Sequence, residues 1–477
     1  MRKILLFTLL CALIITGCVR LRTPKTALSV LTGVDDIESI RQGESILVLA
    51  PHPDDETIGC AGIIQRALAA GAEVRVVYLT NGDHNQAAFI VYEKRLTFRK
   101  GEFIHMGEVR SREAVKAMKQ LGVNESKLVF LGYPDFGTFT ILRDFWQTDK
   151  PFVSMLTRIS QVPYKKNLSY GAPYTGENIL ADIKQVLKKY RPDKIFVSHP
   201  SDTNVDHIAF YLFLQVALCD LKGEIPVPRV YPYLVHCPRW PIPRYYHPDL
   251  VLAPPKQYPA GGDIRWLKSS LSSSELRNKH KAILCYKSQT ESSAFYLLAF
   301  ARRNELFGNY PEITLEPQKS SPDAKSGSPP VFSAKTGTAA HYETEALDYV
   351  SGEGENKIKV GYGYDGAYLY VRVKKNDDLN RHFSTAIYLF GYNYKTPFAA
   401  MPKICIMTKG DRFKVLGSRG ALKPDGTELK FNSGGFLLKI PLTLLGEPDI
   451  VFTSLRAYGV KPRVSLVGFQ KINIRRR

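Results

Sequence analysis

The N-terminal half of the chain alternates short apolar runs with segments of helical period, and this alternation restricts the fold more than any other feature. The run from Ser45 to Ala50 predicts a strand, and residues 57–70 predict a helix that ends at Gly71. Residues 177–190 carry one apolar stripe at helical spacing and precede a second apolar run, 193–198. Such βαβ units predict a parallel sheet covered on both faces, with ligands bound beyond the carboxyl ends of its strands.

The C-terminal part of the chain has a different pattern. Residues 316–335 are rich in Lys, Ser, Pro and Gly, which is typical of a linker. Beyond them, short strand-like runs separated by Gly, Asn and Asp turns predict a β-sandwich. A chain of 477 residues is long enough for two domains. The predicted fold class is therefore α/β, a Rossmann-like, mostly parallel sheet over residues 45–315, followed by an all-β sandwich over residues 336–477.

The first eighteen residues have the features of an export signal. Arg2 and Lys3 precede an apolar stretch, residues 4–15, that is too short to span a membrane. The run Ile15-Thr16-Gly17-Cys18 resembles a bacterial lipobox, which implies that Cys18 is lipidated and becomes the mature N-terminus. We therefore expect an exported lipoprotein of the bacterial cell envelope, held at a membrane through its lipid anchor, with residues 19–44 as a tether. A plain secretory signal is the alternative.

The formal charge of +20 raises the question of an anionic partner. No zinc-finger, homeodomain or RNP signature accompanies the charge, so nucleic acid is not an expected partner. An anionic polysaccharide or a lipid surface fits the excess of Lys and Arg.

The strongest chemical signal is Pro51-His52-Pro53-Asp54-Asp55-Glu56, where the first strand ends and the first helix begins. His52 and Asp55, three residues apart in a tight turn, can point at one cation while Asp54 lies beside it. The alternative is that Asp54 and Asp55 only cap the helix. Helix capping, however, does not require a histidine together with two acids.

A second segment, residues 199–207, also lies between a strand and an apolar helix and contains His199 and His207. Both segments are expected at the same edge of one sheet. Two histidines and a carboxylate with open positions suit a catalytic zinc ion better than a closed structural site. Iron, cobalt or manganese could occupy the same ligands.

With these two motifs, residues 45–310 resemble the PIG-L/LmbE superfamily of zinc-dependent de-N-acetylases, which act on N-acetylglucosamine-type sugars. The resemblance implies that His52, Asp55 and His207 bind Zn²⁺ and that Asp54 is the general base. It implies an N-acetylated sugar or glycan as the substrate.

Weaker matches to the superfamily, and one departure from it, concern other positions. Arg110, which begins Arg110-x-x-Glu113, and Asp135, in Gly132-Tyr133-Pro134-Asp135, are candidate substrate-binding residues. An ion pair between Arg110 and Glu113 is an equal alternative. Many superfamily members have a histidine three residues before the last ligand, where this chain has Asn204. Asn204 can donate a hydrogen bond to the reaction's oxyanion but cannot carry a proton, and His199 could supply the missing imidazole.

The tyrosine-rich run from Tyr362 to Val371 loosely resembles the early hairpin of family 9 carbohydrate-binding modules. Exposed tyrosines would stack on sugar faces, whereas buried ones would pack the sandwich. The function predicted from the whole sequence is hydrolysis of an N-acetyl amide on an amino sugar. The alternatives are hydrolysis of another N-acyl glycoconjugate amide and a non-catalytic, metal-containing, glycan-binding lipoprotein.

Overall fold

The computed structural model describes residues 31–94, 99–147, 149–260, 262–317, 343–347, 357–375, 384–418, 420–432, 435–458 and 464–476. Residues 33–477 form one compact unit. The predicted signal segment, Cys18 and most of the predicted linker lie outside the described residues. Among the helices that are described, none combines the length and the apolarity needed to cross a bilayer.

The first sheet has eight strands in the order β1-β7-β8-β6-β5-β2-β3-β4. Its central strands β6, β5, β2, β3 and β4 are parallel, whereas β8 is antiparallel to both of its neighbours. This arrangement confirms the mostly parallel α/β sheet. The strands are β1 (Asp35–Asp36), β2 (Ser45–Ala50), β3 (Glu73–Thr80), β4 (Leu128–Tyr133), β5 (Lys194–Ser198), β6 (Arg229–Tyr233), β7 (Arg265–Ser270) and β8 (Asn304–Asn309).

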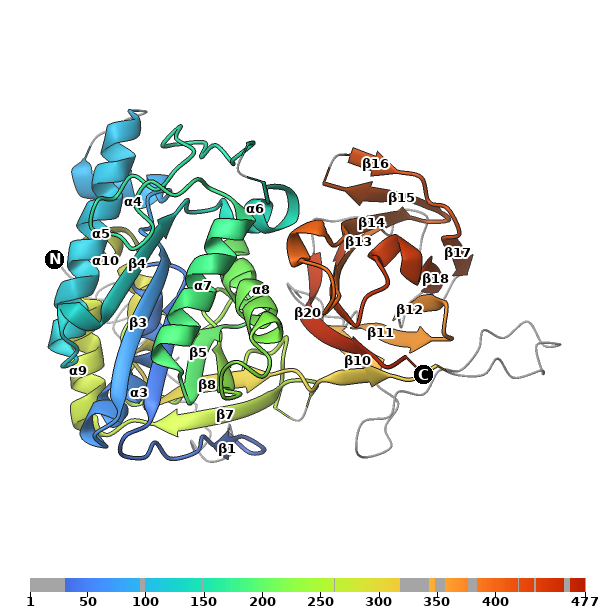
Figure 1. Ribbon diagram of the computed structural model, residues 1–477. Helices are drawn as coiled ribbons and strands as arrows, with labels where there is room; N and C mark the ends of the chain where they lie inside the picture. Colours follow the sequence, from blue (N-terminus) through green and yellow to red (C-terminus); the bar gives the residue numbers. More distant parts are fainter. Residues whose placement is uncertain are drawn as a thin grey trace, which may run out of the picture. The chain divides into compact units, whose positions relative to one another are not determined.

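Eight α-helices are described around this sheet, and Figure 1 shows α7 and α8 side by side over one of its faces. Helix α8 is buried along nearly its whole length, so its periphery is apolar almost all round. The helices are α3 (Asp55–Ala69), α4 (Gln86–Glu93), α5 (Lys100–Gln120), α6 (Thr138–Asp144), α7 (Gly176–Tyr190), α8 (Val205–Asp220), α9 (Ser273–Ile283) and α10 (Lys287–Leu297).

Local sequence explains where several of these helices begin. Thr175 caps α7 by accepting a hydrogen bond from the Asn178 amide. Ser272 and Glu275 form a reciprocal capping box at the start of α9. Helix α5 begins at Lys100, nine residues before the start at Val109 that apolar periodicity indicates. Its first turns combine the buried Phe103 and Met106 with Gly101 and Gly107, and glycine has a low helix propensity, so the sequence indicates the helix only from Val109.

The C-terminal strands form two sheets, of five and seven strands, with the orders β10-β11-β12-β18-β17 and β16-β15-β14-β13-β19-β20-β9. All the described strand pairs are antiparallel except that of β20 with β9, which precedes the predicted linker. The strands are β9 (Ile313–Leu315), β10 (Glu343–Leu347), β11 (Lys357–Tyr364), β12 (Tyr368–Lys375), β13 (Ser384–Tyr392), β14 (Lys403–Lys409), β15 (Arg412–Gly417), β16 (Gly420–Leu422), β17 (Glu428–Asn432), β18 (Gly435–Pro441), β19 (Ile450–Tyr458) and β20 (Val464–Ile474).

Among the described residues, two large hydrophobic cores hold these layers together. One core lies between the two C-terminal sheets, as expected for a sandwich, and includes Tyr362 and Tyr364. These two tyrosines of the β11–β12 hairpin are therefore packing residues and form no sugar-stacking platform. The other core lies under α7 and α8 and extends to Phe390 and Phe469 of the seven-stranded sheet.

Candidate metal centre

Two neighbouring parallel strands bring the two sequence motifs together. His52 lies in the turn after β2, Asp55 is the first residue of α3, and His207 lies in the first turn of α8, which follows β5. Strands β2 and β5 pair in parallel, so their carboxyl ends meet at one edge of the sheet. The structure therefore brings His52, Asp55 and His207 together as the sequence predicts.

The three side chains form a buried cluster around one carboxylate oxygen. Asp55 Oδ2 lies 3.2 Å from His52 Nδ1 and 3.1 Å from His207 Nε2. One ligand atom from each residue lies within 4.8 Å of the other two. Both ring nitrogens of the buried His207 lie 3.1 Å from a carboxylate oxygen, Nε2 from Asp55 and Nδ1 from Asp202, without the alignment of a hydrogen bond. A buried ring nitrogen beside a carboxylate that it does not hydrogen-bond fits a ligand of a divalent metal ion.

Each histidine also faces a second carboxylate with its other ring nitrogen. His207 Nδ1 lies 3.1 Å from Asp202 Oδ2, and His52 Nε2 lies 3.2 Å from Asp206 Oδ2. Metal-binding histidines commonly have their outer nitrogen beside a carboxylate, which orients the ring and fixes the tautomer. Because both rings have this arrangement, the nitrogens that face Asp55, His52 Nδ1 and His207 Nε2, are the expected metal-binding atoms.

His52, Asp135 and Asp206 form a second group with suitable ligand atoms. Asp206, however, already accepts hydrogen bonds from the amides of Phe136 and Thr138, at 2.6 and 3.1 Å, and from the Thr138 hydroxyl. Asp206 therefore anchors the turn after β4 to α8. This use of its oxygens leaves His52, Asp55 and His207 as the better ligand set.

Asp54 lies directly beside the cluster in an unusual backbone conformation. Its φ angle is 122°, a region that residues with a side chain rarely adopt, and such strain often marks a functional position. Burial raises the pKa of Asp54 to about 8, although the opposite charge of Arg110 counteracts the shift. A bound dication would lower that pKa again, toward the ionised form that a base requires.

Arg110 contacts Asp54 rather than Glu113. Its Nη2 donates to Asp54 Oδ2 at 3.2 Å and to Pro53 O at 2.8 Å. Glu113 instead accepts from the amide and hydroxyl of Ser288, at 2.9 and 2.6 Å. Among the described residues, Arg110 therefore forms its ion pair with Asp54 and not with Glu113.

Asp135 lies at the cluster, whereas His199 and Asn204 have other contacts. Asp135 Oδ1 is 3.1 Å from His52 Nε2. The His199 ring stacks on Trp266, with centroids 5.7 Å apart, and its Nδ1 accepts from the Ser201 amide. Asn204 caps α8 through Oδ1, which accepts from the Asp206 amide at 2.9 Å.

The residues that the sequence analysis missed are Asp202, Asp206 and His236. The His236 ring makes an edge contact with His207, with centroids 4.8 Å apart, and stacks on Tyr296. Its backbone amide donates to Asp202 Oδ2 at 2.8 Å. The only signal in the sequence is the position of His236, three residues after the end of a parallel strand, β6.

Comparison with known proteins finds a family similar to part of the α/β domain. Residues 47–218 match the sequence model of the family described as "PIG-L: GlcNAc-PI de-N-acetylase". Over these residues the α/β domain is similar to the PIG-L family. Its metal cluster lies entirely inside the matched residues, whereas His236 lies beyond them.

Two curated proteins match this chain over a short stretch. The 1D-myo-inositol 2-acetamido-2-deoxy-alpha-D-glucopyranoside deacetylases of Mycobacterium avium and Mycolicibacterium paratuberculosis are each 34% identical over 80 residues. This stretch is 17% of the present chain and spans 26% of the length of each relative.

Solved structures similar to this chain include proteins from two further organisms. N,N'-diacetylchitobiose deacetylase from Pyrococcus horikoshii has 19% identity and a TM-score of 0.32, covering 52% of this chain and 70% of its own. The conserved protein TT1542 from Thermus thermophilus has 21% identity and a TM-score of 0.31, covering 52% and 81% respectively.

Proposed function

We propose that the protein is a metal-dependent amidohydrolase that removes the N-acetyl group from an N-acetylglucosamine-type sugar or glycoconjugate. The observation that carries this proposal is the buried His52, Asp55 and His207 cluster with Asp54 beside it, inside the residues that match the PIG-L family model. The names of the family and of its curated relatives, all de-N-acetylases or deacetylases of amino-sugar conjugates, support the substrate class.

We propose zinc as the metal, because two histidines and one carboxylate with open positions are a typical catalytic zinc set. When bound, the ion supplies Lewis acidity, which polarises the acyl carbonyl and makes water easier to deprotonate.

Asp54 is the proposed general base. Its carboxylate accepts a proton from water as the water oxygen bonds to the acetyl carbon. Asp54 then returns this proton to the sugar nitrogen as the C–N bond breaks, so the products are acetate and the free amine. Arg110 holds one oxygen of Asp54 through the 3.2 Å contact and so directs the other oxygen toward the reacting water.

His236 is the proposed imidazole on the oxyanion side of the site. It is only partly buried and contacts His207, and burial lowers its pKa, which keeps the ring neutral at pH 7. Asn204 remains a candidate donor through its Nδ2, since its Oδ1 caps α8. His199 is a weaker candidate because its ring packs on Trp266.

Arg110 and Asp135 are the proposed substrate-binding residues. Arg110 contacts the general base, and Asp135 is adjacent to His52 Nε2. An Asp135 carboxylate at this position can accept hydrogen bonds from sugar hydroxyl groups.

The test is acetate release from a panel of N-acetylglucosamine substrates by zinc-loaded protein. We expect Asp54→Asn to keep its zinc, measured by metal analysis, while losing about 10²–10⁴-fold in rate. His207→Ala should lose both zinc and activity. Zinc-loaded protein that releases acetate from no acetylated sugar would refute the proposal and favour another N-acyl amide substrate or a non-catalytic glycan binder.

A second pair of variants tests the imidazole assignment. Loss of one oxyanion donor lowers turnover by about 10²–10³-fold, so His236→Ala should show a loss of this size. The matched His199→Ala variant should lose far less turnover. The reverse order of the two effects would assign the role to His199.

We also propose that the protein is exported and anchored through a lipid on Cys18. Three features at the N-terminus support this proposal: the basic residues Arg2 and Lys3, the apolar stretch 4–15, and the run Ile15-Thr16-Gly17-Cys18. Labelling of growing cells with a radioactive fatty acid should mark the wild-type protein and leave Cys18→Ser unlabelled. An unlabelled wild-type protein in the soluble exported fraction would instead indicate a plain secretory signal.

A further inference from the structure

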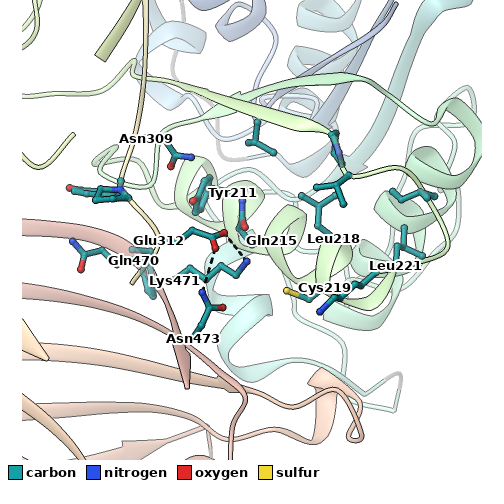
Figure 2. Close-up of a pocket in the computed structure, with 18 of the residues that line it drawn as sticks. Tyr211, Gln215, Leu218, Cys219, Leu221, Asn309, Glu312, Gln470, Lys471 and Asn473 are labelled. Carbon is teal, nitrogen blue, oxygen red and sulfur yellow. Dashed lines mark hydrogen bonds and ion pairs between the residues drawn. The ribbon is translucent and has the colours of Figure 1, made fainter. Parts of the chain in front are cut away.

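A cavity of about 460 Å³ lies away from the metal centre, between the outer side of α8, the segment after β8 and strand β20. Its volume falls within the range of about 300–1,000 Å³ that is typical of small-molecule sites. Figure 2 shows Tyr211 and Gln215 of α8 beside Glu312, with the dashed contacts of Glu312 to Lys471 and Asn473. The chemistry of these side chains indicates what the cavity can bind.

Side-chain amides are the most frequent polar groups at the cavity. Gln215, Asn309, Gln470 and Asn473 all line it. Each amide offers both donors and an acceptor, which matches a sugar hydroxyl group because a hydroxyl also donates and accepts. Gln470 is only 2% exposed, and its Oε1 has no hydrogen-bond partner within the described chain. A buried acceptor without a partner, in the wall of a cavity, is a position that a ligand hydroxyl can satisfy.

Tyrosine rings supply the apolar part of the lining. Tyr211 and Tyr310 line the cavity, and Tyr394 lies at it with half of its surface exposed. Tyr394 is held in place, because its amide donates to Asp449 Oδ2 at 2.9 Å and its ring makes an edge contact with Tyr392. A fixed, exposed ring of this kind can stack on the C–H face of a sugar.

The charged groups at the cavity are engaged with the protein. Lys471 Nζ pairs with Glu312 Oε1 at 3.0 Å, and Lys222 Nζ lies 5.0 Å above the centre of the Tyr394 ring. Asn473 donates to the other oxygen of Glu312 at 3.4 Å. Because Glu312 compensates Lys471, Lys222 is left as a single charge against the Tyr394 ring, and the lining suits a neutral polyhydroxylated ligand better than a multiply charged anion.

We propose that this cavity is a binding site for a neutral oligosaccharide, distinct from the metal centre. Gln215 lies eight residues after His207, a proposed metal ligand, on α8. This separation is about 12 Å along the helix axis. The two sites therefore share one helix without sharing a side chain. The inference rests on the lining of the cavity and stands whether or not the proposed hydrolysis is correct.

The experiment is calorimetric titration of the full chain, carrying Asp54→Asn to prevent turnover, with chitotetraose, cellotetraose, maltotetraose and inorganic phosphate. At least one neutral tetrasaccharide should bind. Gln215→Leu and Tyr394→Ala should each weaken that binding at least tenfold. The control is Tyr170→Ala, because Tyr170 lies outside the cavity and is 55% exposed against 50% for Tyr394; it should change the affinity less than twofold.

Any of three results would overturn the proposal: no tetrasaccharide binds, binding survives both cavity variants, or phosphate binds in place of the sugars. Acetate release by Gln215→Leu and Tyr394→Ala in the otherwise wild-type chain, on an N-acetylated monosaccharide, should equal that of wild type. This readout separates failure of the cavity assignment from failure of the proposed hydrolysis.

Discussion

A buried ion pair behind α3 offers a sharp test of how the metal centre is held. Glu305 on β8 accepts hydrogen bonds from the amides of Gly62 and Ile63, at 2.8 and 3.1 Å. Its Oε1 also lies 2.7 Å from Nζ of Lys279, which in turn donates to Ile58 O at 2.8 Å. Both charged side chains are at most 1% exposed. The pair therefore connects β8 and α9 to the helix whose first residue is Asp55.

The expected cost of breaking the pair follows from its burial. Removing one partner of a buried ion pair leaves an uncompensated charge and typically costs about 3–5 kcal/mol. Glu305→Gln keeps an acceptor for only one of the two α3 amides and leaves Lys279 charged, so we expect a loss within that range. Replacing both charges, with Lys279→Met and Glu305→Gln together, removes the uncompensated charge and should recover about 2 kcal/mol or more of that loss.

The assay is urea denaturation followed by tryptophan fluorescence. All three tryptophans, Trp146, Trp240 and Trp266, precede the sandwich, and Trp146 also packs on Phe398 of the sandwich, so the signal reports on the α/β domain and on this contact. A double-mutant cycle over Lys279→Met and Glu305→Gln should give a coupling energy of about 2 kcal/mol or more. Single variants that cost less than about 1 kcal/mol, or a double variant whose loss equals the sum of the single losses, would refute the reasoning.

Three further outcomes are expected. In Gly468→Ala the new Cβ would lie 2.1 Å from Ser201 Oγ and 2.8 Å from its backbone nitrogen, so overpacking should cost about 1–3 kcal/mol by calorimetry. Gly101→Ala, with open space around it, should cost far less than Gly468→Ala. Burial lowers the pKa of Lys403 from 10.5 to about 7, so the unfolded chain holds this proton up to a higher pH than the folded chain. The free energy of unfolding should therefore rise between pH 7 and pH 10, and Lys403→Met should flatten this rise; an equal slope in the variant would assign it to other groups. Chelation should lower the melting temperature, and zinc at about 100 times its dissociation constant should restore about 2.7 kcal/mol in the wild type but not in His207→Ala; an equal response in both proteins would exclude His207 as a ligand.

Periodicity and motif position account for most of what the sequence predicts correctly. The apolar stripe of α7 and the buried runs of β2 and β5 are regular enough to indicate a parallel sheet. The meeting of the two histidine-containing segments is predictable from this sheet, because each segment comes after one of these strands and the carboxyl ends of β2 and β5 lie at one edge. Residues with weaker patterns are missed, as the glycine-containing start of α5 shows. The short strand β9 is missed as well, because it gains its place only by pairing with β20.

The supporting carboxylates are harder to predict because their role depends on contacts far apart in the sequence. Asp206 lies next to His207 in sequence, yet its oxygens hold the turn at Phe136 and Thr138, some seventy positions earlier. Asp202 accepts from the amides of Val235 and His236, which belong to another strand end. A local motif states which residues are acidic but cannot state which distant amides they satisfy.

The direction of each histidine ring follows from local geometry that a residue pattern does not contain. Side chains alternate across a strand, and the Ser198 hydroxyl at the end of β5 donates to the His207 carbonyl on α8. The next residue, His199, therefore points to the opposite side, where Trp266 covers its ring. Asn204 is occupied in a similar way, because the start of α8 needs a cap. With these two side chains engaged locally, the remaining imidazole beside His207 is His236, and the neighbouring strand β6 delivers it to the same edge of the sheet as the metal ligands.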